Sequence, residues 1–309
     1  MKTRNFVTMI LLLVTAFSLT FNSCKKDKNS DPADSSSLQQ LSRDEEDMEQ
    51  AMDESMNDVD QLLAEGNLKS TSMRPCNANI DSIAIVNDTL TIIISYHGLN
   101  CRGTISRRGI VEIKKHVGTQ WHQTGATVMV RHINFNIKRI RTQRTITLNG
   151  VKVHTNVSGG LIWQLGSGIT SIVHRTRGHV TVKFPDSTFK TWSVARQKTY
   201  TGNPPENLIL TIDGFGDEGT YNNLLVWGIN RHGEQFYTQI MQPVVHRQVC
   251  DWDPVSGIKK HTIPADSKSA TMTFGYDSNN QPVTGSECPT KYRLDWQRHN
   301  QSGTVYLWL

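Results

Sequence analysis

The sequence predicts an all-β protein, an antiparallel meander with a sandwich-like or roll-like arrangement, preceded by one acidic amphipathic helix. From Asn79 onward, apolar residues alternate with a period of two in short runs broken by Gly, Asn, Asp and Pro. In residues 38–66 the apolar residues instead recur at three- and four-residue spacings. No helical pattern interrupts the later strands, so neighbours along the chain are expected to pair through short links.

The N-terminus has the pattern of an export signal. Lys2 and Arg4 precede an uncharged apolar stretch over residues 6–21, and Asn22-Ser23 follows before Cys24. This order predicts a signal peptide over residues 1–23. The apolar stretch is shorter than the ~20 residues that a membrane-spanning helix needs, which makes a retained transmembrane anchor the less favoured alternative.

The segment around Cys24 resembles the lipoproteins of Bacteroidota. Ser23-Cys24 matches the end of a lipobox, and the Lys-, Asp- and Ser-rich run over residues 25–37 is similar to their tethers, although Phe21 and Asn22 depart from the usual residues. The resemblance implies that Cys24 is acylated and that acyl chains attach the protein to a membrane. Lys25 implies onward transport to the outer membrane, and display on the periplasmic or cell-surface side is left open.

A tether and a helix are predicted between this anchor and the β domain. Residues 24–37 are polar and contain Pro32 and a Ser run, which predicts a disordered tether. Residues 38–66 predict the acidic helix, and Gly66 is a stop signal. A solvated stalk, a helix laid on its own basic domain and a partner-binding helix all remain open. The apolar positions of this helix are Leu41, Met48, Met52, Met56, Val59, Leu62 and Leu63.

Charge divides the chain into an acidic part and a basic part. Residues 1–66 hold 6 Lys or Arg against 13 Asp or Glu, whereas residues 67–309 hold 27 against 15. A basic domain can bind nucleic acid, acidic polysaccharide or an anionic membrane surface. Because the chain carries an export signal, no nucleic-acid partner is expected.

Residues 71–309 are predicted to form the β domain, as one unit or as two β subdomains, with roughly fifteen strands. Asn149-Gly150 predicts a type I′ hairpin that pairs Leu148 with Val151. The apolar parity changes near Arg131, which predicts a bulge or bend there. The last strand is apolar on both faces and is predicted to be buried and central. The candidate strands include 89–96, 144–148, 180–184, 208–212, 236–240, 272–276, 292–296 and 304–309.

Four cysteines of the β domain predict two disulfides in an oxidising compartment, with reduced thiols as the alternative. Cys76 and Cys101 enclose two strands and a Gly-containing turn, and Cys250 and Cys288 enclose a similar arrangement, so these pairs are expected. The repeated pattern, with the run Arg-Gly-Ile-Val-Glu-Ile-Lys at residues 108–114, resembles uncharacterised Bacteroidota lipoproteins with Thr-rich β repeats. That resemblance implies no particular activity.

Catalytic and metal-binding motifs are missing from the sequence. There is no Gly-x-Ser-x-Gly, no P-loop and no Cys-x-x-Cys, and the eleven histidines are scattered. His174 and His179 flank Arg-Thr-Arg-Gly, which is predicted to be a surface turn. No enzyme activity, cofactor or metal is therefore expected. A glycoside hydrolase would need paired carboxylates, and the only acidic clusters of the domain are Asp213, Asp217 and Glu218, and Asp251 with Asp253.

Binding is the function that the sequence favours. Basic residues near the predicted bulge alternate with apolar ones, and tryptophans can stack on sugar rings as well as fill a core. The expectation is an outer-membrane, lipid-anchored module for binding or adhesion, with polysaccharide as a candidate ligand. An envelope structural or assembly component with a protein partner and a carbohydrate-active enzyme are the alternatives. The candidate ligand-binding residues are Arg131, Lys138, Arg139, Arg141 and Trp252.

Overall fold

The structure is a computed structural model that describes residues 32–64 and 75–309. It contains one long helix, α2 (Pro32–Ala64), and fifteen strands within these residues. The predicted signal peptide, Cys24 and the tether up to residue 31 lie outside them. The strands are β1 (Ala78–Val86), β2 (Thr89–Leu99), β3 (Ile105–His116), β4 (Ala126–Arg139), β5 (Thr145–Asn156), β6 (Ile172–Lys183), β7 (Phe189–Asn203), β8 (Asn207–Gly214), β9 (Gly216–Glu218), β10 (Tyr221–Ile229), β11 (Gln235–Arg247), β12 (Pro254–Ile263), β13 (Lys268–Tyr276), β14 (Lys291–Arg298) and β15 (Gln301–Trp308).

The strands form one antiparallel sheet in which most neighbours along the chain are neighbours in space. The order runs from β1 to β7 and then from β10 to β15. Two strands lie between β7 and β11. Strand β10 pairs with the N-terminal parts of both, and β8 pairs with their C-terminal parts. The all-β class and the antiparallel meander are therefore confirmed, as a single continuous sheet.

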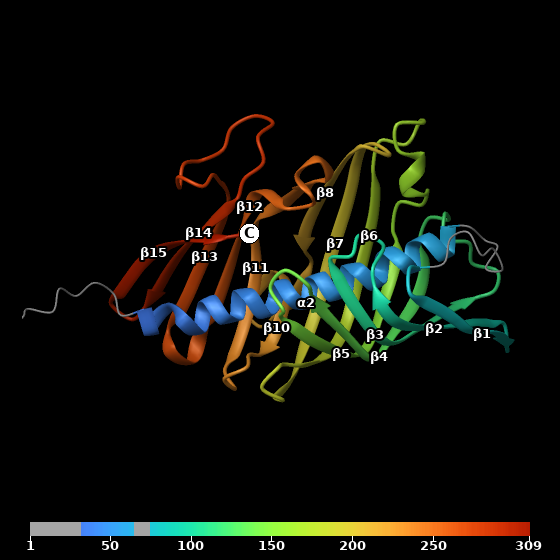
Figure 1. Cartoon of the computed structure of the whole chain (residues 1–309), viewed down its shortest axis with the longest axis horizontal. Helices are drawn as coiled ribbons and strands as arrows, with labels where there is room; N and C mark the ends of the chain where they lie inside the picture. The colour runs from blue at the N-terminus through green and yellow to red at the C-terminus, as the bar shows by residue number, and fades with distance from the viewer. Residues whose placement is uncertain (1–31, 65–74) are drawn as a thin grey trace, which may run out of the picture. The chain divides into compact units, whose positions relative to one another are not determined.

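Helix α2 lies across the strands of this sheet (Figure 1). Its N-terminal part contacts β14 through Ser42 and Tyr292, and its C-terminal part contacts β3 through Asp58 and Arg107. Apolar side chains such as Leu41 and Val59 are fully or almost fully buried against the sheet. The predicted acidic helix is present, and the sheet that it lies on belongs to its own chain.

The helix begins at Pro32, six residues before its predicted start at residue 38. Residues 32–37 therefore belong to the helix and not to the expected tether. A proline is well placed at a helix start, because its missing N–H would have no intrahelical partner there. No helix of the described residues is long and apolar enough to cross a membrane.

The inward face of the sheet changes from apolar to polar along a single strand. In β5, Ile146 and Leu148 are buried, and so are Lys152 and His154 farther along the same face. Val151, on the opposite face, is 38% exposed. Because α2 is acidic, the inward positions of β5 beyond Leu148 carry basic and polar residues, and the apolar Val151 lies outward.

The predicted hairpin at Asn149-Gly150 is wrong, because β5 continues through these residues and pairs with β4 and β6 along its length. A side chain at Gly150 would collide with the backbone of His179. Glycine is therefore needed here because two strands approach each other closely, and not because the chain turns. The Asn149 side-chain oxygen accepts a hydrogen bond of 2.8 Å from the backbone N–H of Asn134.

The predicted bulge near Arg131 is confirmed. The β4–β5 register shifts between His132 and Phe135, and Asn134 has a positive φ of 47°. Gly109 of β3 faces this bulge, where a Cβ atom would collide with the Asn134 carbonyl oxygen. The bulge explains why apolar residues change parity along β4.

The turn between β4 and β5 passes over α2 (Figure 1). Arg139 and Arg144, which flank this turn, form ion pairs with Glu46 and Asp47 of the helix. Within the turn, the Arg141 guanidinium donates to the Leu309 carbonyl oxygen at 3.0 Å. The middle of the helix is thus held between the sheet and this turn.

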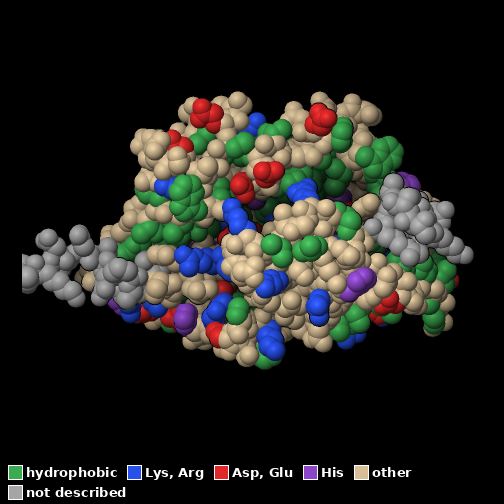
Figure 2. All heavy atoms as spheres, viewed as in Figure 1, with side chains coloured by type: hydrophobic (Ala, Val, Ile, Leu, Met, Phe, Trp, Pro, Cys, Tyr) green, Lys and Arg blue, Asp and Glu red, His purple; other side chains and the backbone are tan. Residues whose placement is uncertain are grey.

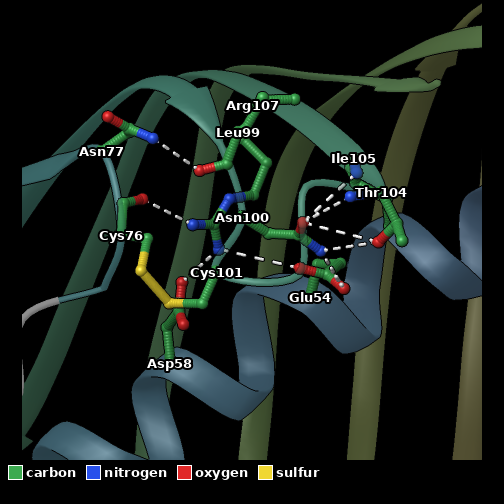
Figure 3. The surroundings of a disulfide bond; sticks show 10 residues. All are labelled: Glu54, Asp58, Cys76, Asn77, Leu99, Asn100, Cys101, Thr104, Ile105 and Arg107. Atoms are coloured by element: carbon green, nitrogen blue, oxygen red, sulfur yellow. Dashed lines mark hydrogen bonds and ion pairs between the residues drawn. A yellow bond between two sulfur atoms is a disulfide. The ribbon is translucent and has the colours of Figure 1, made fainter.

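Both expected disulfides are present, Cys76–Cys101 and Cys250–Cys288. Figure 3 shows how the first is joined to the helix by Arg107, which donates to the Cys76 carbonyl oxygen and to the Asp58 carboxylate, both at 2.7 Å. Loops of 25 and 38 residues closed in this way each stabilise the fold by roughly 3–4 kcal/mol on the chain-entropy view.

The last strand is not central as predicted, because β15 is the outer strand of the sheet and pairs only with β14. Its apolar residues are partly covered, and Trp308 remains 65% exposed. The Lys291 ammonium lies 4.6 Å from the centre of the Trp308 ring. An apolar edge strand thus has the same sequence pattern as a buried central one.

Neutralising one helix carboxylate should destabilise the fold. Asp53 pairs with Arg196 at 2.7 Å and with Lys198 at 2.6 Å, and both cations are almost fully buried. Asp53→Asn leaves two buried cations without their counter-charge, so the free energy of unfolding in urea is expected to fall by about 3 kcal/mol. The control is Asp88→Asn in the exposed turn between β1 and β2, with a change within about 0.5 kcal/mol. Equal stability of the two variants would contradict this account.

Candidate functional site

A groove of about 1170 Å³ extends along α2 between Ser42 and Ala64. The helix forms one part of its lining, and strands β3, β4, β6–β8 and β11–β14 with several of their connecting turns form the rest. Figure 2 shows a hollow on this face, with acidic and basic side chains at its edge. The volume is above the roughly 300–1,000 Å³ that is usual for small-molecule sites, which suits an extended ligand.

Most charges in the groove are paired between the helix and the sheet. Asp53 is held by Arg196 and Lys198, and Glu49 lies 2.8 Å from the Lys259 ammonium. Burial alone would raise the pKa of Asp53, but the charges of Arg196 and Lys198 outweigh it and hold that pKa well below its usual range. Asp53 and Glu49 are therefore ionised at neutral pH, and both are engaged in ion pairs with cations of the sheet.

Deeper under the groove, a chain of hydrogen bonds joins the helix to β11 and β12. The Thr238 hydroxyl donates to Glu45 at 2.6 Å and lies 2.8 Å from Nδ1 of His261, which acts as the donor. Burial, opposed by the charge of Lys259, raises the pKa of Glu45 to about 7. Burial and the neighbouring Lys259 lower the pKa of His261 to about 3. His261 is therefore neutral in the folded protein.

Aromatic rings supply the other part of the groove wall. Trp163, in a short 3₁₀ helix (Ile162–Gln164), is 65% exposed, and Trp252 is half-buried. The Trp252 carbonyl oxygen is held at 2.8 Å by Nδ1 of His246. Trp121 lies at the end of the groove near Asp60 and is almost fully buried.

One buried amide positions the loops at this end. The Asn156 side chain donates to the carbonyl oxygens of Trp121 and Gly160, both at 2.8 Å, and accepts from the Gly159 N–H at 2.9 Å. Asn156 is fully buried at the end of β5. It therefore fixes the segment that presents Trp163 relative to Trp121.

The structure brings together only some of the candidate ligand-binding residues. Arg139, Arg141 and Trp252 line the groove, but Arg139 is occupied by Glu46 and Asp47. Arg131 is exposed beside Glu112, and Lys138 lies half-buried in β4; neither lines the groove. The basic run thus does not form one charged sheet face, because the bulge in β4 separates its members.

The acidic clusters are also separated. Asp251 and Asp253 line the groove, whereas Asp213, Asp217 and Glu218 lie outside it in β8 and β9. Desolvation and the neighbouring Asp251 raise the pKa of Asp253, although Arg141 opposes this effect. The groove therefore holds one of the two predicted clusters.

Sequence reasoning missed a compact group made of Asp60, His154 and His174. The predicted surface turn between His174 and His179 is wrong, because both residues belong to β6, where His174 faces inward and is 1% exposed. The three residues come from α2, β5 and β6, so no local spacing could reveal them. The sequence signal for this group is that β5 and β6 each carry a histidine, His154 and His174, at a position on the inward face of the sheet.

The chain matches no protein-family model, and neither the curated proteins nor the solved structures contain a significant match to it.

Acidification should destabilise the fold through His261. An unfolded histidine has a pKa near 6.5, so between this value and about 3 the unfolded chain binds one more proton at this position. The free energy of unfolding therefore falls, by up to ~1.4 kcal/mol per pH unit, as pH decreases below about 6.5. In His261→Asn this contribution is absent, so urea unfolding between pH 7 and pH 4 should show a shallower decline. The control is His97→Asn at an exposed position, and a wild-type slope in His261→Asn would refute the assignment.

Proposed function

We propose that this chain is a non-catalytic binding module that holds a polysaccharide in the groove beside α2, and that it is attached through acylated Cys24 to the outer membrane. The observation that carries the binding proposal is the combination of a long groove with the exposed ring of Trp163 and the half-buried ring of Trp252. Flat aromatic faces pack well against sugar rings, whose polar edges bind neighbouring hydrogen-bonding groups.

The polar lining of the groove supports this ligand class. Unlike the paired carboxylates of α2, Asn57 and Gln61 are exposed polar side chains on its groove side. Arg102 and Thr142, from the turns after β2 and β4, also line the groove. A site with amides, hydroxyls and a guanidinium between aromatic rings offers both the donors and the acceptors that a hydroxyl-rich ligand needs.

The pairing of charges supports a binding role over a catalytic one. Glu49 and Asp53 line the groove along α2, and a buried cation engages each of them and lowers its pKa. Burial raises the pKa of Glu54 and Asp58 in the same lining, but both of these carboxylates pair with Arg107. A glycoside hydrolase needs one carboxylate with a raised pKa and a second that is free to act as base or nucleophile. Ion-paired carboxylates with lowered pKa values do not serve as the acid.

The internal use of α2 also bears on the protein-partner alternative. Its carboxylates at Asp44, Asp53 and Asp58 contact cations of the sheet. A partner that recognised the acidic face would have to displace these contacts. The groove beside the helix is the better candidate for the binding surface.

A carbohydrate-active enzyme is the second candidate, favoured by Asp253, whose pKa is raised by desolvation beside Asp251. Turnover of a polysaccharide that is lost in both Asp253→Asn and Asp251→Asn would support this candidate. Turnover that survives both changes would exclude these carboxylates.

Replacing the groove tryptophans should weaken glycan binding. Trp163→Ala and Trp252→Ala each remove a stacking surface, so affinity for a bound polysaccharide is expected to fall about fivefold or more, which corresponds to about 1 kcal/mol. The measurement is a glycan array with acidic and neutral polysaccharides, followed by titration of any ligand found. Trp308→Ala is the matched control, since Trp308 is as exposed as Trp163, at 65%, but lies outside the groove. If wild-type protein binds no glycan, the proposal fails.

Removing the lipidation site should release the protein from membranes. In Cys24→Ala the sulfur that would carry the acyl chains is absent, so the protein is expected in the soluble fraction after cell fractionation. Ser23→Ala, which keeps the cysteine, serves as the control and should remain in the membrane fraction. A Cys24→Ala protein that stays with the membranes would contradict lipid anchoring. Protease treatment of intact cells distinguishes surface display from periplasmic display.

A further inference from the structure

From the geometry around the C-terminal part of α2 we infer that Asp60, His154 and His174 form a site for a divalent ion of the zinc class, with one coordination position open to the groove. The three side chains come from α2, β5 and β6, and one ligand atom from each lies within 4.8 Å of the others. This site is independent of the proposed glycan-binding role.

The distances fit metal ligands. Nε2 of His154 lies 3.2 Å from one oxygen of Asp60, and Nδ1 of His174 lies 3.5 Å from the other. Ligands at the usual zinc distances of about 2.0–2.2 Å stand ~3.4 Å apart along the edge of a tetrahedron. The observed spacings of 3.2 and 3.5 Å are therefore close to such an edge, and a bound ion would take the place of the hydrogen bond between His154 and Asp60.

His174 supplies an independent observation. Its side chain is 1% exposed, yet neither ring nitrogen makes a well-formed hydrogen bond to any described residue. Buried imidazole nitrogens are rarely left in this state, because the loss of hydration then has no compensation. A metal ion bound to one nitrogen explains why a polar ring stands here in place of an apolar one.

The surroundings orient the ligands as metal sites require. Nδ1 of His154 lies 2.8 Å from the Thr176 hydroxyl, which leaves Nε2 free to point at Asp60. Such a hydrogen bond fixes the tautomer and the orientation of a ligating histidine. The Trp121 ring stacks on His154 and packs against His174, with centroid distances of 5.1 and 5.2 Å. Tyr200 packs on the other side of His174.

The nearby positive charge is partly offset. Lys198, whose field reaches Asp60, lies 2.6 Å from Asp53, a carboxylate that it shares with Arg196. Imidazole and carboxylate ligands suit zinc and its neighbours, whereas calcium and magnesium prefer all-oxygen sites. Asp60 and His174 line the groove, so the fourth position can accept water or an oxygen atom of a ligand.

The test is a titration of the purified, chelator-treated full chain with Zn²⁺ by calorimetry, and with Co²⁺ by visible absorption. We expect about one ion per chain and intense cobalt bands typical of four or five ligands. Asp60→Asn and His174→Gln should each weaken zinc binding by about 100-fold, and Thr176→Val, which loses the orienting hydroxyl, by about 10-fold. Circular dichroism confirms that each variant is folded.

The matched control is His179→Gln, because His179 lies on the same strand but faces outward and is exposed. Its zinc affinity should stay within about twofold of the wild type. X-ray absorption of the zinc-loaded wild-type protein gives a readout that needs no variant, and it should show nitrogen and oxygen ligands with two imidazoles. Absence of stoichiometric binding, wild-type affinity in folded His174→Gln, or a shell that contains sulfur would overturn the site.

Discussion

The ion pairing between α2 and the inward face of the sheet is the interaction on which the rest of the structure depends. Strands distant in the sequence each supply a cation to this helix, among them Lys259 of β12, Arg196 of β7 and Arg107 of β3. Buried pairs of this kind add little net stability, because desolvation offsets their attraction. Their effect is specificity: the removal of either partner leaves a buried charge, so one register of the helix on the sheet is strongly favoured.

The same pairing explains the chemistry of the groove. Carboxylates that are fixed by cations cannot turn toward a ligand, so the proposed glycan site consists of aromatic rings and exposed polar side chains such as Asn57 and Gln61, and the proposed ion site around Asp60 lies beside it. Asn156 connects these features, since it anchors the Trp121 and Trp163 loops at the end of the strand that also carries His154. The side chains that fix the helix on the sheet are thus different from the side chains beside the helix that are available for binding.

Sequence patterns predicted the helix, the meander, the bulge and the cysteine pairs, because each depends on local spacing or on flanking strands. They failed where the inward face is polar. The predicted hairpin pairs Leu148 with Val151, but the inward position beyond Leu148 is Lys152, which lies in the field of Asp53 on the acidic helix. For the same reason the sequence predicts a surface turn beside His174, because a polar residue at an inward position does not look like a core residue. The candidate site was not predictable, because it joins residues of α2, β5 and β6 that only the docked helix brings together.

The docking of α2 also determines the order in which the molecule can be completed. The helix is synthesised before the strands that it contacts, and its partners arrive late: Arg231 follows Asp44 by 187 residues, and Tyr292 follows Ser42 by 250. Contacts of such long range slow folding, and an amphipathic segment without its partners exposes apolar surface while it waits. The helix is therefore made before the sheet but is among the last elements to reach its final surroundings, and a chain that loses its final strands cannot enclose it.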